Sequence, residues 1–148
     1  MNPFEQLLED LGKLLQISLH AEQGFLCKLN MKGLSIQLEY DETKQTLFMV
    51  SFLPQAAVGL FSENLFLEAL KDNATNDPFG VFGYAEGTGS LALQLLVPIS
   101  TSADKVFDLL GHFKEKSLLW KEAIEQNTLS PIQKPVAKNA PSPLSFMR

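Results

Sequence analysis

The chain has 148 residues, which fits a single domain, and its 45% hydrophobic and 20% charged content excludes wholesale disorder. Its formal net charge of −5 opposes binding to a nucleic-acid backbone, whose phosphates proteins neutralise with lysine and arginine. We therefore expect one folded domain whose partners do not include nucleic acid.

The first predicted element is an amphipathic helix over residues 4–15. Asn2 can cap this helix by accepting backbone N–H bonds, and Pro3 suits the first helical position because that position needs no amide donor. The apolar side chains recur every three or four residues and so share one helix face. They are Phe4, Leu7, Leu8, Leu11, Leu14 and Leu15.

The sequence period then changes to the two-residue alternation of half-buried strands. The alternation is clearest over residues 25–29 and 34–40, and residues 31–33 between them are few enough for a hairpin connection. A third segment, residues 46–53, is apolar on both faces, which is typical of a central strand. These segments predict an antiparallel meander.

A second helix and a second hairpin are predicted next. Residues 63–71 favour a short helix, and residues 73–78 have the composition of a turn. Residues 79–85 and 90–98 alternate on either side of a glycine-containing turn. The second hairpin would extend the sheet to about five strands.

A long helix should follow and pack across the sheet. Thr101 and Ser102 offer N-cap hydroxyls to it. Its inner side would carry Val106, Leu109, Leu110, Phe113, Trp120 and Ile124. The predicted fold class is α+β, with an antiparallel, twisted sheet of about five strands packed with three helices in the order α-β-β-β-α-β-β-α.

The composition changes at residue 128. Residues 128–148 contain four of the eight prolines, three basic residues and no acidic residue, which is typical of a disordered tail. The remaining nine basic and 17 acidic residues give residues 1–127 a net charge of −8. We expect a domain over residues 1–127 and a Pro-rich tail over residues 128–148.

Residue types that carry enzyme chemistry are few and scattered. His20 and His112 have no metal-ligand spacing, and Cys27 alternates with strand residues as a small buried hydrophobe does. The glycine-rich segment 83–89 precedes a strand pattern rather than a helix, which predicts a hairpin turn and not a phosphate-binding loop. We therefore expect no enzyme activity, no metal and no cofactor.

The compartment is indicated by the single cysteine, which cannot form an intramolecular disulfide and so favours a reducing environment. The first residues lack the basic and apolar regions of a secretory signal. The fullest apolar run, residues 47–53, is too short to cross a membrane. We expect a cytoplasmic protein with no membrane insertion.

The chain has more large apolar residues than one small sheet and its helices need. Two interpretations are open: all of them fit into the core, or some stay exposed in a monomer and form protein interfaces. The residues concerned are Leu26, Leu47, Met49, Leu53, Phe61, Phe66, Phe79 and Phe82. An alternative function is a small apolar-ligand carrier, in which the sheet and the long helix enclose a pocket.

Several motifs between residues 65 and 124 resemble those of a known family. They are Leu65, Leu70 and Asn73 in the short helix, Gly80 and Gly83 in the hairpin, the alternating strand that ends at Val97 and Pro98, and Phe107, Leu110, Phe113, Trp120 and Ile124 in the long helix. With the element order, the length and the acidity, they resemble the class I chaperones of bacterial type III secretion, which are small acidic dimers that bind effector proteins before export. The resemblance covers residues 1–127.

The resemblance implies a non-enzymatic homodimer in the bacterial cytoplasm that holds an N-terminal effector segment in extended form, with part of the segment added to a sheet edge. The implied dimer interface consists of Leu65, Phe66, Phe79, Val81 and Phe82. The implied effector-binding patch consists of Leu14, Ile17, Leu19, Phe25, Leu34, Ile36 and Met49, each with a core position as the alternative. The implied partners are secreted effectors, a second copy of the chain, and the secretion ATPase or sorting components.

Overall fold

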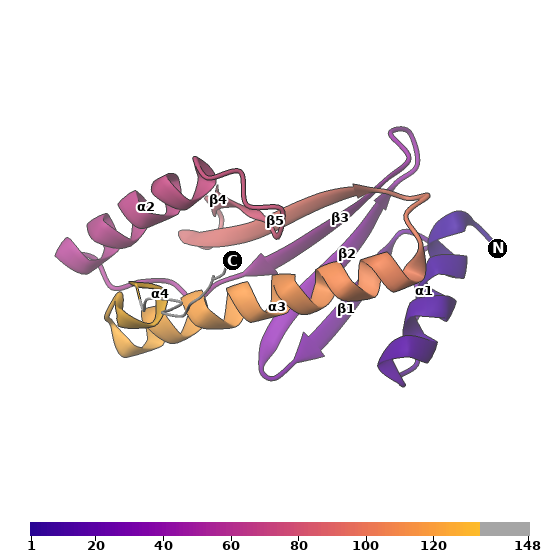
Figure 1. Cartoon of the computed structure of the whole chain (residues 1–148), viewed down its shortest axis with the longest axis horizontal. Coiled ribbons are helices and arrows are strands. Elements are labelled where there is room, and N and C mark those ends of the chain that lie inside the picture. The colour runs from indigo at the N-terminus through magenta and orange to yellow at the C-terminus, as the bar shows by residue number, and fades with distance from the viewer. Residues whose placement is uncertain (134–148) are drawn as a thin grey trace, which may run out of the picture.

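A five-stranded antiparallel sheet forms the centre of the computed structural model, which describes residues 1–133 (Figure 1). The strands are β1 (Leu26–Met31), β2 (Leu34–Asp41), β3 (Thr46–Phe52), β4 (Val81–Ala85) and β5 (Ser90–Pro98). Their spatial order is β1-β2-β3-β5-β4. The two edges are therefore β1 and β4, and β3 is the central strand, as predicted.

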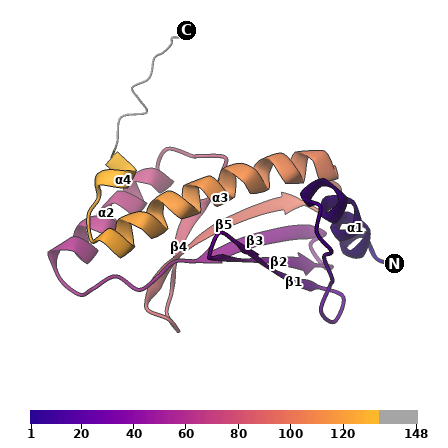
Figure 2. The same ribbon diagram turned by 90° about the horizontal axis from the view of Figure 1, so that it is seen from below.

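The helices are α1 (Pro3–Leu15), α2 (Leu60–Asn73), α3 (Ala103–Gln126) and the single turn α4 (Ser130–Gln133). The helices α1 and α3 lie on the same side of the sheet, and α2 lies beside β4 (Figure 2). The α+β class and the predicted element order are confirmed. Within residues 1–133, none of the helices combines the length and the apolar character needed to span a membrane.

One face of the sheet forms the core together with α1 and α3. The register places Met49 opposite both Leu38 and Leu95, so these side chains share a face. The hydroxyl oxygens of Ser51 and Ser117 lie 2.8 Å apart, which identifies this face as the one beneath α3. The largest fully buried side chains are Phe4, Leu8, Leu11, Leu34, Ile36, Leu38, Leu47, Met49, Leu65, Leu93, Leu110 and Phe113.

The predicted surplus of apolar residues is mostly taken up by the core. Leu47, Met49, Leu53 and Phe82 are buried, and the other four residues of that set are partly buried. Large exposed apolar side chains come instead from other positions. The most exposed of those on α2 and the sheet are Leu60, Leu67, Leu70, Tyr84 and Leu96.

The folded body extends past the predicted boundary at residue 127. Leu129 and Ile132 pack against the core, and Pro131 is buried in α4. The Nε2 of Gln133 donates a hydrogen bond of 2.9 Å to Oε1 of Glu68, which joins this segment to α2. Residues 128–133 are therefore packed, which corrects their assignment to a disordered tail, and residues 134–148 lie outside the described residues.

Candidate functional site

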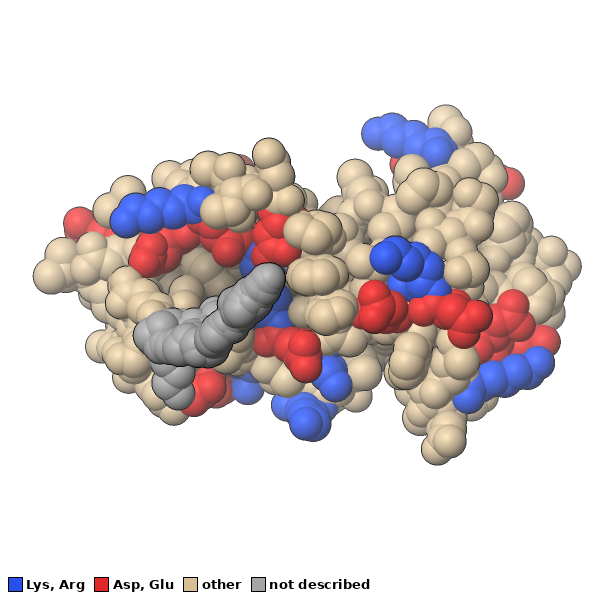
Figure 3. Space-filling view, in the orientation of Figure 1, with Lys and Arg blue, Asp and Glu red and all other residues tan. Residues whose placement is uncertain are grey.

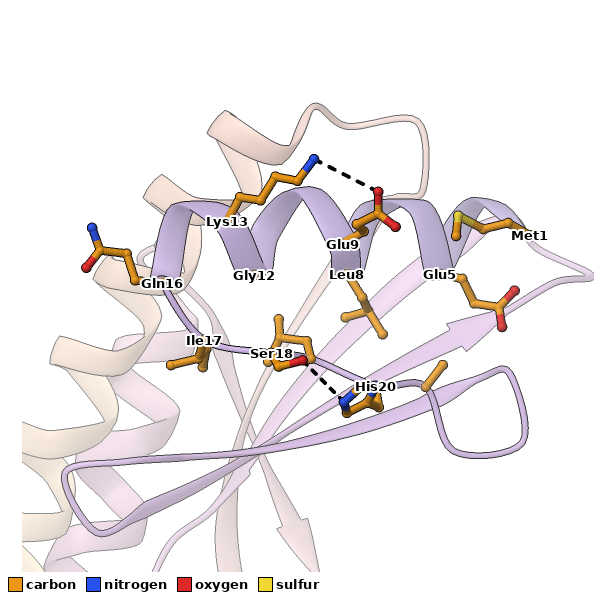
Figure 4. A pocket seen from close by; sticks show the side chains of 12 residues that line it. Met1, Glu5, Leu8, Glu9, Gly12, Lys13, Gln16, Ile17, Ser18 and His20 are labelled. Carbon is orange, nitrogen blue, oxygen red and sulfur yellow. Dashed lines mark hydrogen bonds and ion pairs between the residues drawn. The ribbon is translucent and has the colours of Figure 1, made fainter.

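A groove of about 680 Å³ lies between α1 and residues 16–21, which run back along the helix and which we call the return segment (Figure 4). Its apolar lining consists of Met1, Leu8, Ile17, Leu19 and Ala21. Its polar lining consists of Glu5, Glu9, Lys13, Gln16, Ser18 and His20. The groove therefore offers apolar contacts beside polar groups of both charges.

The return segment can approach α1 because residue 12 has no side chain. Gln16 ends the helix in a left-handed conformation, with φ of 61°, and the N–H of Ile17 donates to the carbonyl oxygen of Gly12 at 3.0 Å. A Cβ on Gly12 would lie 2.7 Å from the carbonyl oxygen of Ile17, closer than real Cβ contacts. Glycine inside a helix costs stability relative to alanine. Here it permits the close approach that forms the groove.

The start of α1 is also tied to the chain beyond the return segment. Asn2 and Glu5 form a capping box, in which Oδ1 of Asn2 accepts from the Glu5 N–H at 2.7 Å and Oε1 of Glu5 accepts from the Asn2 N–H at 2.9 Å. The Nδ2 of Asn2 donates to the carbonyl oxygen of Gly24 at 3.0 Å. The groove is thus fixed at both ends, by the turn after α1 and by Asn2. The predicted cap is confirmed.

The backbone of the return segment has unused hydrogen-bonding groups. Within residues 1–133, no N–H or C=O of residues 18–21 takes part in a backbone–backbone hydrogen bond, and the His20 N–H bonds to the buried Cys27 thiol. The segment leads by a turn into the edge strand β1. Backbone groups of this kind need water or another chain as partner. The groove therefore has backbone groups without a backbone partner next to apolar side chains.

The charged groups of the groove have partners within it. Glu5 is held in the capping box, and the Nζ of Lys13 lies 4.0 Å from Oε1 of Glu9. The Oγ of Ser18 and the Nε2 of His20 lie 3.2 Å apart (Figure 4). The side chains of Lys13 and Glu9 are still 74% and 50% exposed, so the groove presents charged groups as well as apolar side chains to a ligand.

The predicted effector-binding residues separate into two groups. Leu14, Ile17 and Phe25 are exposed and Leu19 is partly buried, and only Ile17 and Leu19 line the groove. The other three, in β2 and β3, are buried in the core. They are Leu34, Ile36 and Met49. Their side chains face the helices, which corrects their assignment to a binding surface.

Several groove residues were missed by the sequence reasoning. Glu5 and Glu9 lie outside the apolar stripe of α1, so the amphipathic pattern gave no sign of their role in the groove. Ser18 and His20 belong to a segment without periodicity. Gly12 gave one usable sign, because a glycine inside a strong helical pattern often marks a close backbone approach.

A second exposed apolar surface lies on α2 and β4. Leu67 and Leu70 are 55% and 65% exposed, and Val81 and Tyr84 on β4 are also exposed. We call Leu67, Leu70 and Tyr84 the α2–β4 surface, because the ring of Tyr84 contacts Phe66 of α2, whereas Val81, three residues earlier in β4, lies on the opposite face of the sheet. The side chain of Asn73 links the two elements, donating to the carbonyl oxygen of Phe82 at 2.9 Å and accepting from its N–H at 2.7 Å.

The predicted dimer-interface residues lie mostly behind this surface. Leu65 and Phe82 are buried within the monomer, where Phe82 packs on Trp120 with ring centroids 4.2 Å apart. Phe79 is partly buried and stacks on His112 at 4.1 Å. Of the remaining two, Phe66 is partly buried against Tyr84 and Val81 is exposed. Leu65 and Phe82 can therefore support an interface but offer little contact area.

The residues considered for catalysis are not assembled into a catalytic arrangement. Cys27 is buried, as predicted, and burial raises the pKa of its thiol, so the thiol stays protonated at neutral pH. His112 lies within 4 Å of Asp108 and Glu115 on the exposed side of α3. Among the described residues, no group of three or more His, Cys, Asp or Glu side chains could hold a metal ion. The glycine-rich segment forms the predicted turn between β4 and β5, where the N–H of Gly89 donates to the carbonyl oxygen of Ala85 at 2.8 Å.

The space that a small-ligand carrier would use is occupied by side chains. Between the sheet and α3, Phe82 contacts Trp120 and Ser51 contacts Ser117. Phe113 of α3 is fully buried in the same layer. These contacts favour a packed core over a ligand cavity at this place.

No protein-family model and no curated protein sequence matches the chain. Solved structures do match. A chain of the HopA1–SchA chaperone–effector complex has a TM-score of 0.69 at 18% identity, covering 82% of this chain and 94% of that chain. A chain of the ExsC–ExsE complex has a TM-score of 0.69 at 15% identity, covering 82% and 92%.

A third similar structure is that of the Yersinia pestis type III secretion chaperone SycH in complex with a fragment of YscM2. It has a TM-score of 0.63 at 14% identity and covers 78% of this chain and 97% of that chain. The chain therefore has the fold seen in these chaperone–effector complexes.

Proposed function

We propose that the chain is a class I type III secretion chaperone that binds an N-terminal segment of a secreted effector in extended form and directs it to the secretion apparatus. The observation that carries the proposal is the groove beside α1, where apolar side chains lie next to backbone groups of residues 18–21 that have no backbone partner. The shared fold with chaperones in effector complexes supports it.

Strand addition is the binding mode that this arrangement suits. A client segment would form main-chain hydrogen bonds to the return segment, each contributing about 0.5–1.5 kcal/mol net. Alternate client side chains would contact Ile17, Leu19 and Leu8 in the groove. Backbone bonds would supply affinity for any extended chain, and the apolar contacts would set the register.

The charge of the body favours neutral or basic client segments. Residues 1–127 carry nine basic and 17 acidic residues. On the face shown in Figure 3, acidic side chains are spread over the helices, and basic ones are interspersed without a large basic patch. Attraction of a basic segment would speed encounter and weaken as salt screens it.

The proposed chaperone is a homodimer that pairs through the α2–β4 surface, with Phe66 and Phe79 at its border. Leu67 and Leu70 lie on one face of α2, three residues apart, and are too exposed to serve the monomer's core. Binding and release need no nucleotide, because ordering a client segment costs about 2–5 kcal/mol of the gross interaction energy and keeps binding reversible. We place the protein in the bacterial cytoplasm, where the secretion ATPase or sorting components would receive the loaded complex.

The test is affinity capture of the tagged chain from its native cells, with mass spectrometry of the bound proteins and light scattering of the complex. The proposal predicts a dimer that retains secreted proteins through short N-terminal segments. Ile17→Glu should weaken this capture at least about tenfold, because a charge would enter the apolar groove. The matched control is Phe52→Glu, which should retain the clients: Phe52 is 41% exposed, against 50% for Ile17, and lies on the face of the sheet that the helices do not cover.

Two results would contradict the proposal. A client-free monomer that carries a small apolar molecule would favour the ligand carrier. Equal capture of clients by Ile17→Glu and the unmodified chain would remove the groove beside α1 as the binding site.

A further inference from the structure

A single lysine joins α3 to the connection between α2 and β4. The side chain of Lys116, in the second half of α3, is only 10% exposed. Its Nζ donates to Oδ2 of Asp72, to Oδ2 of Asp77 at 2.8 Å and to the carbonyl oxygen of Gly80 at 3.0 Å. These bonds use all three ammonium protons. All hydrogen bonds that the Lys116 ammonium can donate therefore go to this connection.

The three acceptors are spaced along the whole connection. Asp72 lies in the last turn of α2, Asp77 lies in the turn that follows, and Gly80 directly precedes β4. Gly80 has φ of 132°, and a Cβ there would lie 3.0 Å from the side chain of Leu93. The connection consequently lies close to β5, which is possible because Gly80 has no side chain, and it is bonded to α3 through Lys116.

The same ammonium lies close to the first residues of β4. Its Nζ is 5.2 Å from the ring centroid of Phe82, and that ring packs on Trp120 of α3. Attraction between a cation and an aromatic face strengthens when water is excluded, as it is here. Lys116 therefore contacts the end of α2, the turn and the start of β4 at once.

Removal of the lysine charge would leave an unfavourable arrangement. Asp72 and Asp77 both approach the same nitrogen, so their carboxylates would face each other without a positive charge between them. Like charges that are partly shielded from water repel strongly. The connection would move away from α3, and the two bonds between the Asn73 side chain and the Phe82 backbone would remain as the direct link that limits how far β4 shifts relative to α2.

We infer that Lys116 is a positioning residue for subunit pairing: it sets the relative placement of α2 and β4 that forms the α2–β4 surface. The inference rests on the homodimer proposed above. Lys116 itself is hidden from a partner, so it acts through the residues that it holds. A buried charge on α3 thereby controls whether the exposed side chains of two other elements form one surface.

The test measures the dimer dissociation constant by sedimentation over a dilution series. Lys116→Met should raise this constant at least about tenfold, whereas Lys116→Arg, which keeps the charge and several donors, should stay within about threefold. The matched control is Lys121→Met, because Lys121 lies on the same helix and pairs only with Glu125 there, at 2.8 Å. This control should leave the constant unchanged.

A second set of variants separates positioning from a general loss of folding. In the Lys116→Met chain, replacing both Asp72 and Asp77 by Asn should restore part of the affinity, because neutral amides do not repel each other. Asp77→Asn alone removes one of the three bonds and should weaken the dimer about threefold even if Lys116→Met fails to fold.

The outcomes distinguish failure of the role inferred for Lys116 from failure of the proposed homodimer. A dimeric wild type whose dissociation constant is unaffected by Lys116→Met and by Asp77→Asn overturns the role of Lys116. A dimeric wild type in which Lys121→Met weakens pairing as much as Lys116→Met also overturns it. A monomeric wild type overturns the proposed homodimer instead, and the role of Lys116 falls with it.

Discussion

Replacing Gly12 by alanine should lower the free energy of unfolding, although alanine is the better helix former. In an ordinary helix interior the exchange stabilises by about 0.5–1 kcal/mol. Here the new Cβ would lie 2.7 Å from the carbonyl oxygen of Ile17, which is backbone and cannot rotate away. The return segment must move, and the cost of this movement makes the change in the free energy of unfolding unfavourable.

The expected magnitude follows from the contacts that would be lost. Moving residue 17 strains or breaks the 3.0 Å bond from its N–H to the carbonyl oxygen of Gly12, which contributes about 0.5–1.5 kcal/mol. Leu19, whose Cγ and backbone nitrogen would lie 3.7 Å from the new Cβ, would be in ordinary van der Waals contact with it, so the clash is confined to the carbonyl oxygen of Ile17. Overpacking of this kind costs about 1–3 kcal/mol, so a net loss of about 1 kcal/mol remains after the helix-propensity gain.

The assay is urea unfolding of Gly12→Ala beside the matched variant Gly111→Ala. Gly111 lies within α3, and a Cβ there would meet nothing within 4 Å, so this control should gain about 0.5–1 kcal/mol. Gly12→Ala should also weaken client binding, because the return segment lines the groove. If both variants are stabilised equally and client binding is retained, the account of Gly12 is refuted.

The remaining predictions concern assembly, the core and pH. Leu67→Glu should convert the dimer to a folded monomer in light scattering, because this exposed side chain serves no core, and Leu96→Glu on the open sheet face should leave the dimer intact. Ser51→Ala should cost about 1–3 kcal/mol in urea unfolding because the buried hydroxyl of Ser117 loses its partner, and the double variant Ser51→Ala with Ser117→Ala should cost less than the single one; additive costs would contradict this. Burial raises the pKa of the Asp77 carboxyl, but hydrogen bonds from Lys116 and from the Phe79 N–H outweigh burial and hold that pKa below its ordinary value. The pKa is thus lower in the folded than in the unfolded chain, so this carboxylate stabilises the fold at neutral pH and the stabilisation is lost as the pH falls below about 4. The stability difference between the wild type and Asp77→Asn should therefore shrink on acidification, and a difference that grows would contradict the assignment.

Local patterns were sufficient to predict the five strands and the three longer helices of the fold. The apolar stripe of α1 begins at Phe4 and its cap is Asn2, as the spacing and the residue types indicated. Residues 46–53 are apolar on both faces, which predicted a central strand, and β3 lies at the centre of the sheet. These features depend on neighbours within a few residues, and the sequence displays such neighbours directly.

The candidate site depended on contacts that local patterns do not contain. Alternation shows that Ile36 shares a face of the sheet with Leu34 and Leu38, but it does not show which face the helices cover. In the structure Ile36 is a core residue. The return segment has no periodicity, and its position follows from Gly12 and from the bond between Asn2 and Gly24. The proline content after residue 127 concealed α4, which is held by packing on α3.

The central claim is that a client segment pairs with those backbone groups of residues 18–21 that have no partner within the chain. The most direct test is amide hydrogen exchange of residues 18–21, resolved by NMR, with and without the client segment recovered by affinity capture. Strand addition predicts that alternate amides of this segment slow at least about tenfold on binding, because they gain hydrogen-bond partners. Unchanged exchange at all four residues in a saturated complex would contradict the account.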